Sequence, residues 1–221
     1  MSDGTISLER LTAWLGRFAE LVTDQRAYLT ELDSAIGDAD HGANMARGMT
    51  AVMEKIGAGT PAGAADELFK SVGMTLVTSV GGASGPLYGT FFLRMGMTAG
   101  AVPSFDGGSL GTALRAGLEG VVARGKAEAG DKTMFDAMAP ALDAYDAAIS
   151  GGGTVQDAAA AAFAAAEAGR DATAPLVARK GRASYLGERS AGHLDPGATS
   201  TALLFQALSE TLSGTTTPTG G

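Results

Sequence analysis

The segment from Asp33 to Asn44 gathers side chains suited to binding a metal ion. It reads DSAIGDADHGAN and places three carboxylates, Asp33, Asp38 and Asp40, within eight residues. Gly37 allows the chain to reverse after a helix end, so Asp38 and Asp40 can return towards Asp33. Converging carboxylates repel one another unless a cation neutralises them, and hard oxygen ligands favour Mg²⁺ or Ca²⁺. In the competing interpretation, Asp38 or Asp40 caps the next helix and the other carboxylates are solvated.

A glycine-rich loop, Gly81–Thr90, offers backbone chemistry. Its sequence GGASGPLYGT leads small residues into a helix start, with Pro86 at a first-turn position. Free backbone N–H groups at a helix N-terminus can bind phosphate. The same small residues are typical of a close crossing between two helices, and both interpretations stay open.

Two further segments carry cations in an otherwise acidic chain. Around Arg124–Lys126 and Gly130–Met134, the simpler interpretation is a helix end and a helix start with solvated lysines. The segment Arg179–Arg189 holds four basic side chains. Arginine suits bidentate phosphate contacts, whereas a solvated basic face is the alternative. The sequence DPGAT from Asp195 is typical of a turn that starts a helix.

The elements that must position these segments are helices. From Ile6 to Leu32 apolar residues recur at steps of three and four, which defines one apolar face. Met74–Val80 has a strand-like composition but continues a helical pattern from Ala64, so we expect helix there. Similar periodicity recurs in residues 43–57, 64–79, 86–99, 109–127, 134–149, 154–170 and 198–213. The pattern predicts an all-α fold of about eight helices, with the motifs in their connections.

The composition excludes several classes of protein. The chain has 24 acidic and 16 basic side chains, a formal charge of −8 that argues against a nucleic-acid-binding surface. It has no cysteine, which excludes disulfides and thiol catalysis. No apolar run approaches the roughly 20 residues that span a bilayer, so we expect a cytoplasmic protein that binds no membrane. Walker A and Gly-x-Gly-x-x-Gly motifs are also absent, so a nucleotide would need another kind of site.

Taken together, the four segments resemble the L subunit of dihydroxyacetone kinase, the nucleotide-binding half of that enzyme. The matching stretches are GDADHGANM, VGGASGPLYGTFF, RGKAEAGDKTM and RKGRASYLGERSAGHLDPGATS, in the family's order. The resemblance implies an eight-helix antiparallel barrel with the nucleotide at one end. We expect one domain over residues 1–213, and residues 214–221 have the composition of a disordered tail.

The resemblance also implies the ligands and their residues. ADP or ATP would be held through two Mg²⁺ ions bound by Asp33, Asp38 and Asp40, which with Arg182 would form the catalytic set. By the same matching, the nucleotide would be contacted by His41, Asn44, Gly82, Ala83, Ser84, Gly125, Met134, Arg182, Asp195, Pro196 and Gly197. The family usually has glycine where Ala39 stands. Alanine disfavours a positive φ, so we expect the loop to differ slightly there.

The resemblance implies a phosphotransferase that is incomplete alone, because the family binds dihydroxyacetone on a separate K subunit. Expected partners are that K subunit, a phosphotransferase-system phosphocarrier (the M subunit) that recharges bound ADP, and a second copy in a homodimer. Free ATP stays open as the phosphate donor. Other functions also stay open: a kinase subunit for another small ketose such as erythrulose, a nucleotide-loaded regulatory module, and a lipid-binding helical barrel. The last would leave the carboxylate loop and the arginine segment unexplained.

Overall fold

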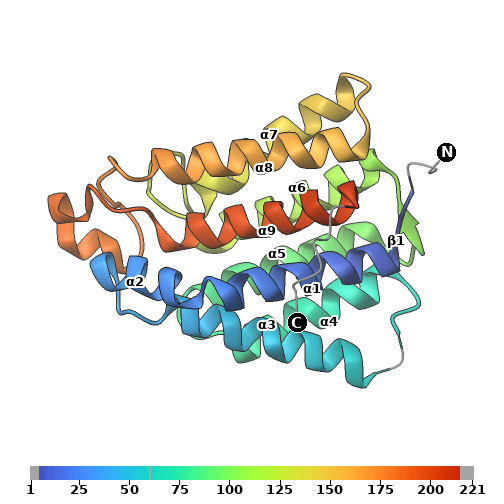
Figure 1. The fold of residues 1–221 in the computed structure, drawn as a ribbon, viewed down its shortest axis with the longest axis horizontal. Helices are drawn as coiled ribbons and strands as arrows, with labels where there is room; N and C mark the ends of the chain where they lie inside the picture. Colours follow the sequence, from blue (N-terminus) through green and yellow to red (C-terminus); the bar gives the residue numbers. More distant parts are fainter. Residues whose placement is uncertain (1–4, 60, 215–221) are drawn as a thin grey trace.

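The computed structural model describes residues 5–59 and 61–214, and these residues are mostly helical (Figure 1). The elements are β1 (Ile6–Ser7), α1 (Leu8–Asp24), α2 (Arg26–Ile36), α3 (His41–Ala58), α4 (Ala65–Ser79), α5 (Ser84–Ala99), β2 (Ser104–Phe105), α6 (Gly107–Gly125), α7 (Phe135–Ser150), α8 (Val155–Ala172), η1 (Arg182–Ser190) and α9 (Pro196–Ser213). The predicted all-α fold is confirmed, including the helix over 74–79. Apart from Gly214, the predicted tail lies outside the described residues.

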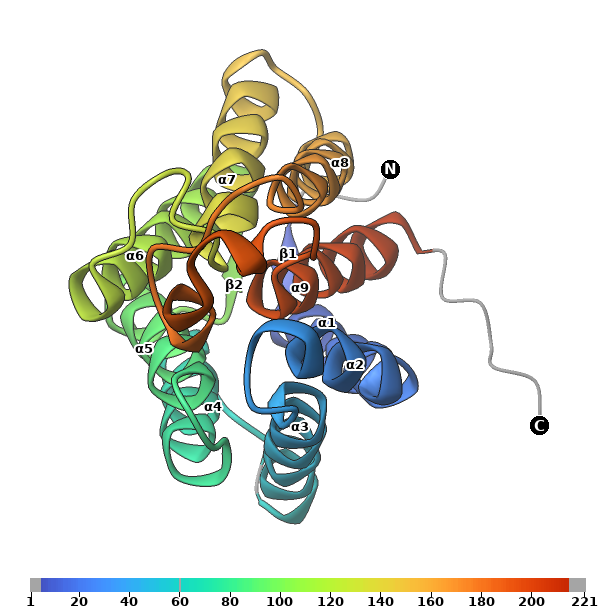
Figure 2. The same cartoon turned by 90° about the vertical axis from the view of Figure 1, so that its left-hand side faces the viewer.

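The helices form a closed circuit. α3 packs on α1 and α2, each later helix packs on its predecessor, and α9 packs on both α8 and α1. Figure 2 looks along this ring from one end. Because α1 and α2 follow one another along the same position, eight positions surround the centre. The order of contacts therefore agrees with the antiparallel barrel that the family resemblance implies.

The first predicted helix is broken at Gln25. The backbone N–H of Gln25 still bonds to the Leu21 carbonyl at 2.9 Å, and the Leu29 N–H bonds to the Gln25 carbonyl at 2.9 Å. The φ and ψ of Gln25, −90° and 8°, nevertheless leave the helical range. The apolar periodicity continues across the break, so the sequence pattern predicted one helix where there are two.

Aromatic side chains fill the centre of the ring. The ring centroid of Trp14 lies 6.4 Å from that of Phe69 and 6.0 Å from that of Phe92. The Trp14 indole N–H donates to the Leu204 carbonyl at 2.9 Å, which satisfies its polar group and ties α1 to α9. Truncating such a side chain typically costs about 3–5 kcal/mol. At this level the interior is filled by protein side chains.

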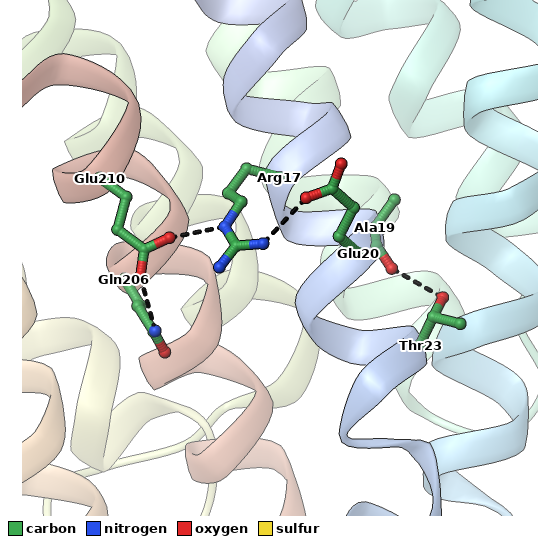
Figure 3. A network of polar contacts seen from close by, with 6 residues as sticks. All are labelled: Arg17, Ala19, Glu20, Thr23, Gln206 and Glu210. Carbon is green, nitrogen blue, oxygen red and sulfur yellow. Dashed lines mark hydrogen bonds and ion pairs between the residues drawn. The ribbon is translucent and has the colours of Figure 1, made fainter. Parts of the chain in front are cut away.

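A half-buried ion-pair network closes the ring between α1 and α9 (Figure 3). Arg17 donates to Glu210 on α9 at 2.6 Å and to Glu20 on its own helix at 2.9 Å. Gln206 donates to the other oxygen of Glu210 at 2.8 Å. The network adds polar contacts between the first helix and the last.

At the end of the ring where α1 begins, a two-residue strand pair links the segment before α1 to the connection between α5 and α6. Ile6 pairs with Phe105 and Ser7 with Ser104, antiparallel. No strand was predicted, because this pairing depends on tertiary proximity and not on local alternation. None of the described helices is long and apolar enough to cross a bilayer.

Candidate metal and phosphate site

Four connections meet at the end of the ring that faces the viewer in Figure 2. They join α2 to α3, α4 to α5, α6 to α7 and α8 to α9, and a cavity of about 590 Å³ lies among them. The residues from the predicted site that line this cavity are Asp33, Asp38, Asp40, His41, Gly82, Ala83, Ser84, Gly125, Met134, Arg182, Asp195, Pro196 and Gly197. The four motifs therefore converge, although they are far apart in the sequence.

The three carboxylates do come together. One oxygen from each of Asp33, Asp38 and Asp40 lies within 4.8 Å of the others. Gly37 makes this possible, because a Cβ there would lie 2.0 Å from Asp33 Oδ1. Three oxygen donors at this spacing suit a hard cation.

The helix-capping interpretation is also realised, but by a different residue. Asp40 occupies the N-cap position of α3 without a side-chain cap bond. The cap comes from Asp33, whose Oδ2 accepts from the N–H groups of Asp40 at 2.8 Å and His41 at 3.1 Å. These bonds hold one side of the Asp33 carboxylate in a fixed orientation and place it beside the positive end of α3.

Ala39 adopts the conformation that glycine would adopt more readily. Its φ is +61°, a left-handed conformation that costs alanine more than glycine. In the described residues, the other non-glycine residues with positive φ are Lys126 at +50° and Lys132 at +64°. All three belong to connections at the cavity end, where strained backbone often accompanies function.

Arg182 begins η1 and reaches the carboxylate cluster. Its Nε lies 3.0 Å from Asp38 Oδ2, and its side chain is 68% exposed. Solvent screens such an exposed pair, which therefore contributes little to stability. The contact shows that the guanidinium can reach the place where the carboxylates converge.

His41 is the centre of a buried polar chain that links three helices. Its Nε2 lies 2.9 Å from Ser200 Oγ on α9, and its Nδ1 lies 3.1 Å from Ser84 Oγ on α5. Ser200 in turn contacts the Tyr88 hydroxyl at 2.8 Å. Burial lowers the pKa of His41 to about 4, against the opposing effect of the carboxylates of Asp33 and Asp40. The imidazole is therefore neutral at pH 7, and its ring is held from both sides.

The glycine-rich loop has two roles, divided by residue. Gly82 and Ala83 are exposed at the cavity, where the backbone is accessible before α5 begins. Gly85 and Gly89 instead serve close packing, because a Cβ on them would lie 2.3 Å from the Val80 carbonyl and 2.4 Å from Val77 Cγ2. The close-crossing interpretation is thus confirmed for Gly85 and Gly89, whereas phosphate binding at Gly82 and Ala83 stays a prediction.

Asn44 is the predicted nucleotide contact that does not line the cavity. It is 6% exposed, and its Oδ1 accepts from Arg47 at 2.7 Å. A Cβ on Gly81 would lie 2.9 Å from that oxygen, so Asn44 lies directly beneath the glycine-rich loop. This position supports the loop from below.

The expectation of solvated lysines is correct for Lys126 and wrong for Lys132. Lys126 is exposed at the C-cap of α6. Lys132 is 1% exposed, and its ammonium donates to backbone carbonyls of the α8–α9 connection. Its burial depends on residues 41 to 61 positions later, so no local signal could reveal it.

Asp195 caps α9, as its turn sequence predicted. Its Oδ2 accepts from the Ala198 N–H at 2.7 Å, and Pro196 follows at the first helical position. Burial raises the pKa of Asp195 to about 7, although the Ala198 N–H and the nearby Lys132 oppose this shift. The start of α9 thus lies at the cavity with a carboxyl group that titrates near neutrality.

This geometry defines a class of protein: an all-helical ring that combines a carboxylate cluster for a hard cation with helix N-termini and an arginine suited to phosphate. The family model described as the DAK2 domain matches residues 35–210. The chain belongs to this family.

Relatives of known function agree with this assignment over nearly the whole chain. The PEP-dependent dihydroxyacetone kinase ADP-binding subunit DhaL of Escherichia coli is 45% identical, over 92% of this chain and 97% of the relative. The PTS-dependent counterpart of Lactococcus lactis is 44% identical, over 93% and 98%. A crystal structure of the C. freundii dihydroxyacetone kinase with AMP-PNP and Mg²⁺ superposes with a TM-score of 0.69 at 30% identity. It covers 90% of this chain, which spans only 33% of that longer protein.

Proposed function

We propose that this protein is the nucleotide-binding subunit of a dihydroxyacetone kinase, a phosphotransferase that acts on dihydroxyacetone held by a separate K subunit. The observation that carries the proposal is the convergence of Asp33, Asp38 and Asp40 in one cavity with Arg182 and the start of α5. The full-length similarity to ADP-binding subunits supports it.

The carboxylate cluster fits magnesium by its donor chemistry. Asp33, Asp38 and Asp40 supply only oxygen donors, close enough to share cations, and we assign them two Mg²⁺ ions. Bound magnesium would neutralise charge on the phosphate oxygens and orient them, which is the main requirement of phosphoryl transfer. The C. freundii kinase solved with AMP-PNP and Mg²⁺ supports this pairing of metal and nucleotide.

The chain's own groups would bind the nucleotide around that centre. The backbone at Gly82–Ser84 and the first turn of α9 offer N–H groups and the positive ends of two helices to phosphate. Arg182, which pairs with Asp38 at 3.0 Å, can turn its planar fork to phosphate oxygens when Asp38 binds a cation. Neutral His41 orients Ser84 at the start of α5. Gly125 and Met134 border the space assigned to the base.

The proposal extends to the donor and the assembly. Because the similar subunits of E. coli and L. lactis belong to PEP- or PTS-dependent kinases, we assign ADP the role of a bound coenzyme that a phosphocarrier, the M subunit, recharges. The K subunit supplies the acceptor, and the chain itself forms a homodimer. Sedimentation tests the dimer, and a comparison of a phosphocarrier with free ATP as donor tests the coenzyme role.

Calorimetric titration with ADP and Mg²⁺ tests the site. The variants Asp33→Asn, Asp38→Asn and Asp40→Asn keep the side-chain size but remove the charge, so each should weaken Mg²⁺-dependent ADP binding by about tenfold or more. Asp143→Asn is the matched control, because this exposed carboxylate lies on α7 in an ion pair with Arg115. Unchanged affinity in all three site variants would remove the metal assignment.

Phosphoryl transfer tests the function itself. With a K subunit and a phosphate donor, the wild-type chain should support phosphorylation of dihydroxyacetone, and the three variants should not. Erythrulose serves as a second acceptor, since the sugar is chosen by the partner. A protein that binds Mg-ADP but never supports transfer with any such partner would contradict the enzymatic role.

A further inference from the structure

The connection from α8 to α9 leaves and re-enters the body of the protein at neighbouring points. Residues 174–194, here called the 174–194 segment, contain η1 with Arg182 and the 86% exposed Tyr185. The Gly192 N–H donates to the Ala174 carbonyl at 2.7 Å, and the Asp195 N–H donates to Thr173 Oγ1 at 3.0 Å. The segment is therefore a loop with its two ends bonded together.

Lys132 holds both ends of this loop at once. Its ammonium lies 2.9 Å from the carbonyl of Thr173, 3.3 Å from that of Ala174 and 3.0 Å from that of Leu176, at the outgoing end. At the returning end it lies 2.6 Å from the His193 carbonyl. A lysine has only three N–H donors for these four acceptors, so all of them are engaged.

The remainder of the segment carries this anchoring to the cavity. Ala183 and Leu186 pack on Ile36 at the end of α2, and Arg182 pairs with Asp38. The Arg179 N–H also donates to the carbonyl of Asp131, the residue next to Lys132. The position of Arg182 over the carboxylates thus depends on the two ends that Lys132 binds.

We infer that Lys132 is a positioning residue that holds the 174–194 segment, with Arg182, over the nucleotide cavity. The alternative is that Lys132 contributes only to global stability, as any buried side chain does. The two differ in the native state: a positioning role affects the segment and the bound nucleotide well below the melting temperature, and a purely structural role does not. The effect on nucleotide rests on the proposed function, whereas the effect on the segment does not.

The test compares Lys132→Met with two controls in the full chain. Methionine keeps the Cβ and most of the side-chain length, so the backbone strain at φ +64° is unchanged while the ammonium is lost. Lys126→Met is the matched charge control, an exposed lysine of the same connection with φ +50°. Leu11→Ala, in the core at the start of α1, is the control for lost stability.

Two measurements at 25 °C distinguish the positioning role of Lys132 from a purely structural one. Limited trypsin digestion should cut Lys132→Met within 179–189 about tenfold faster than wild type, because the segment opens locally more often. Release of ADP in the presence of Mg²⁺ should also accelerate about tenfold, since opening exposes the cavity. Neither control should change either rate. Lys132→Gln, which keeps a shorter donor, should give an intermediate effect and replaces Lys132→Met if that variant does not fold.

Wild-type rates in both Lys132→Met and Lys132→Gln, or equal acceleration by Leu11→Ala, would overturn the inference. A wild-type protein that binds no ADP would instead contradict the proposed function, and the trypsin comparison would still test Lys132.

Discussion

Replacement of Ala39 by glycine should stabilise the protein. Ala39 is exposed between two of the candidate metal ligands, with φ at +61°. An L-residue in this left-handed region bears a cost of about 1–2 kcal/mol, which removal of Cβ relieves. Glycine also adds freedom to the unfolded chain, which costs about 0.4–1 kcal/mol. The midpoints of these two ranges, about 1.5 and 0.7 kcal/mol, predict a net gain of about 0.8 kcal/mol in the free energy of unfolding.

The assay is chemical denaturation of the metal-free protein, with thermal melting as a second measure. For a chain of this size, 1 kcal/mol corresponds to roughly 2–4 °C, so the melting temperature should rise by about 1–4 °C. Ala164→Gly is the matched control, because Ala164 is exposed within α8. A glycine inside a helix should lower stability by about 0.5–1 kcal/mol. The same substitution should therefore raise the free energy of unfolding at position 39 and lower it at position 164.

A loss of stability in Ala39→Gly equal to that in Ala164→Gly would refute the reasoning. It would mean that the loop around Ala39 relaxes without strain. Affinity for Mg-ADP should survive the substitution, because the loop already has the shape that glycine prefers.

Three further predictions concern the ligand, Arg182 and pH. Mg-ADP at about a hundred times its dissociation constant should raise the free energy of unfolding by roughly 2.7 kcal/mol, and EDTA should reverse this; melting curves indifferent to both would exclude the site. Arg182→Lys keeps the charge but loses the planar fork. If the contact forms only in the transition state, kcat measured with a K subunit should fall while ADP affinity barely changes. Wild-type kinetics and affinity in both Arg182→Lys and Arg182→Ala would mean that Arg182 is a solvated surface residue. The pKa of Asp195 is raised from 3.8 to about 7, so its contribution to stability is present below pH 4 and lost as pH rises through 7. Asp195→Asn can still cap α9. Denaturation should show that the free energy of unfolding of this variant, relative to wild type, increases between about pH 4 and 7, by at most about 4 kcal/mol. A difference independent of pH would contradict the shifted pKa.

The helices were predictable because their apolar faces are regular, whereas the exceptions depend on contacts distant in sequence. Gln25 interrupts α1 and α2 without a glycine or proline, and glutamine is a good helix former. The η1 turn lies in a connection without helical periodicity. Its apolar residues pack on Ile36, which lies about 150 residues earlier. Neither feature has a local signature.

The site was predictable as a set of motifs but not as a set of roles. The convergence of Asp33, Asp38 and Asp40 followed from their spacing around Gly37. That Asp33 also caps α3 did not follow, because the cap crosses a turn whose shape depends on Ala39. The burial of Lys132 was not predictable either, because its four acceptors are backbone carbonyls, which carry no sequence signal.

The alternation of helix direction explains why the chemistry lies at one end. In an antiparallel ring every second connection returns to the same end, so the α2–α3, α4–α5, α6–α7 and α8–α9 connections must meet. These are the four connections that carry the carboxylates, the glycine-rich loop, the buried lysine and the arginine segment. The connections at the other end, such as residues 100–106 and 151–154, hold turns, caps and the short strand pair. The spacing of the motifs at every second connection therefore indicates a single site, and the loops that form it can vary while the aromatic centre holds the ring together.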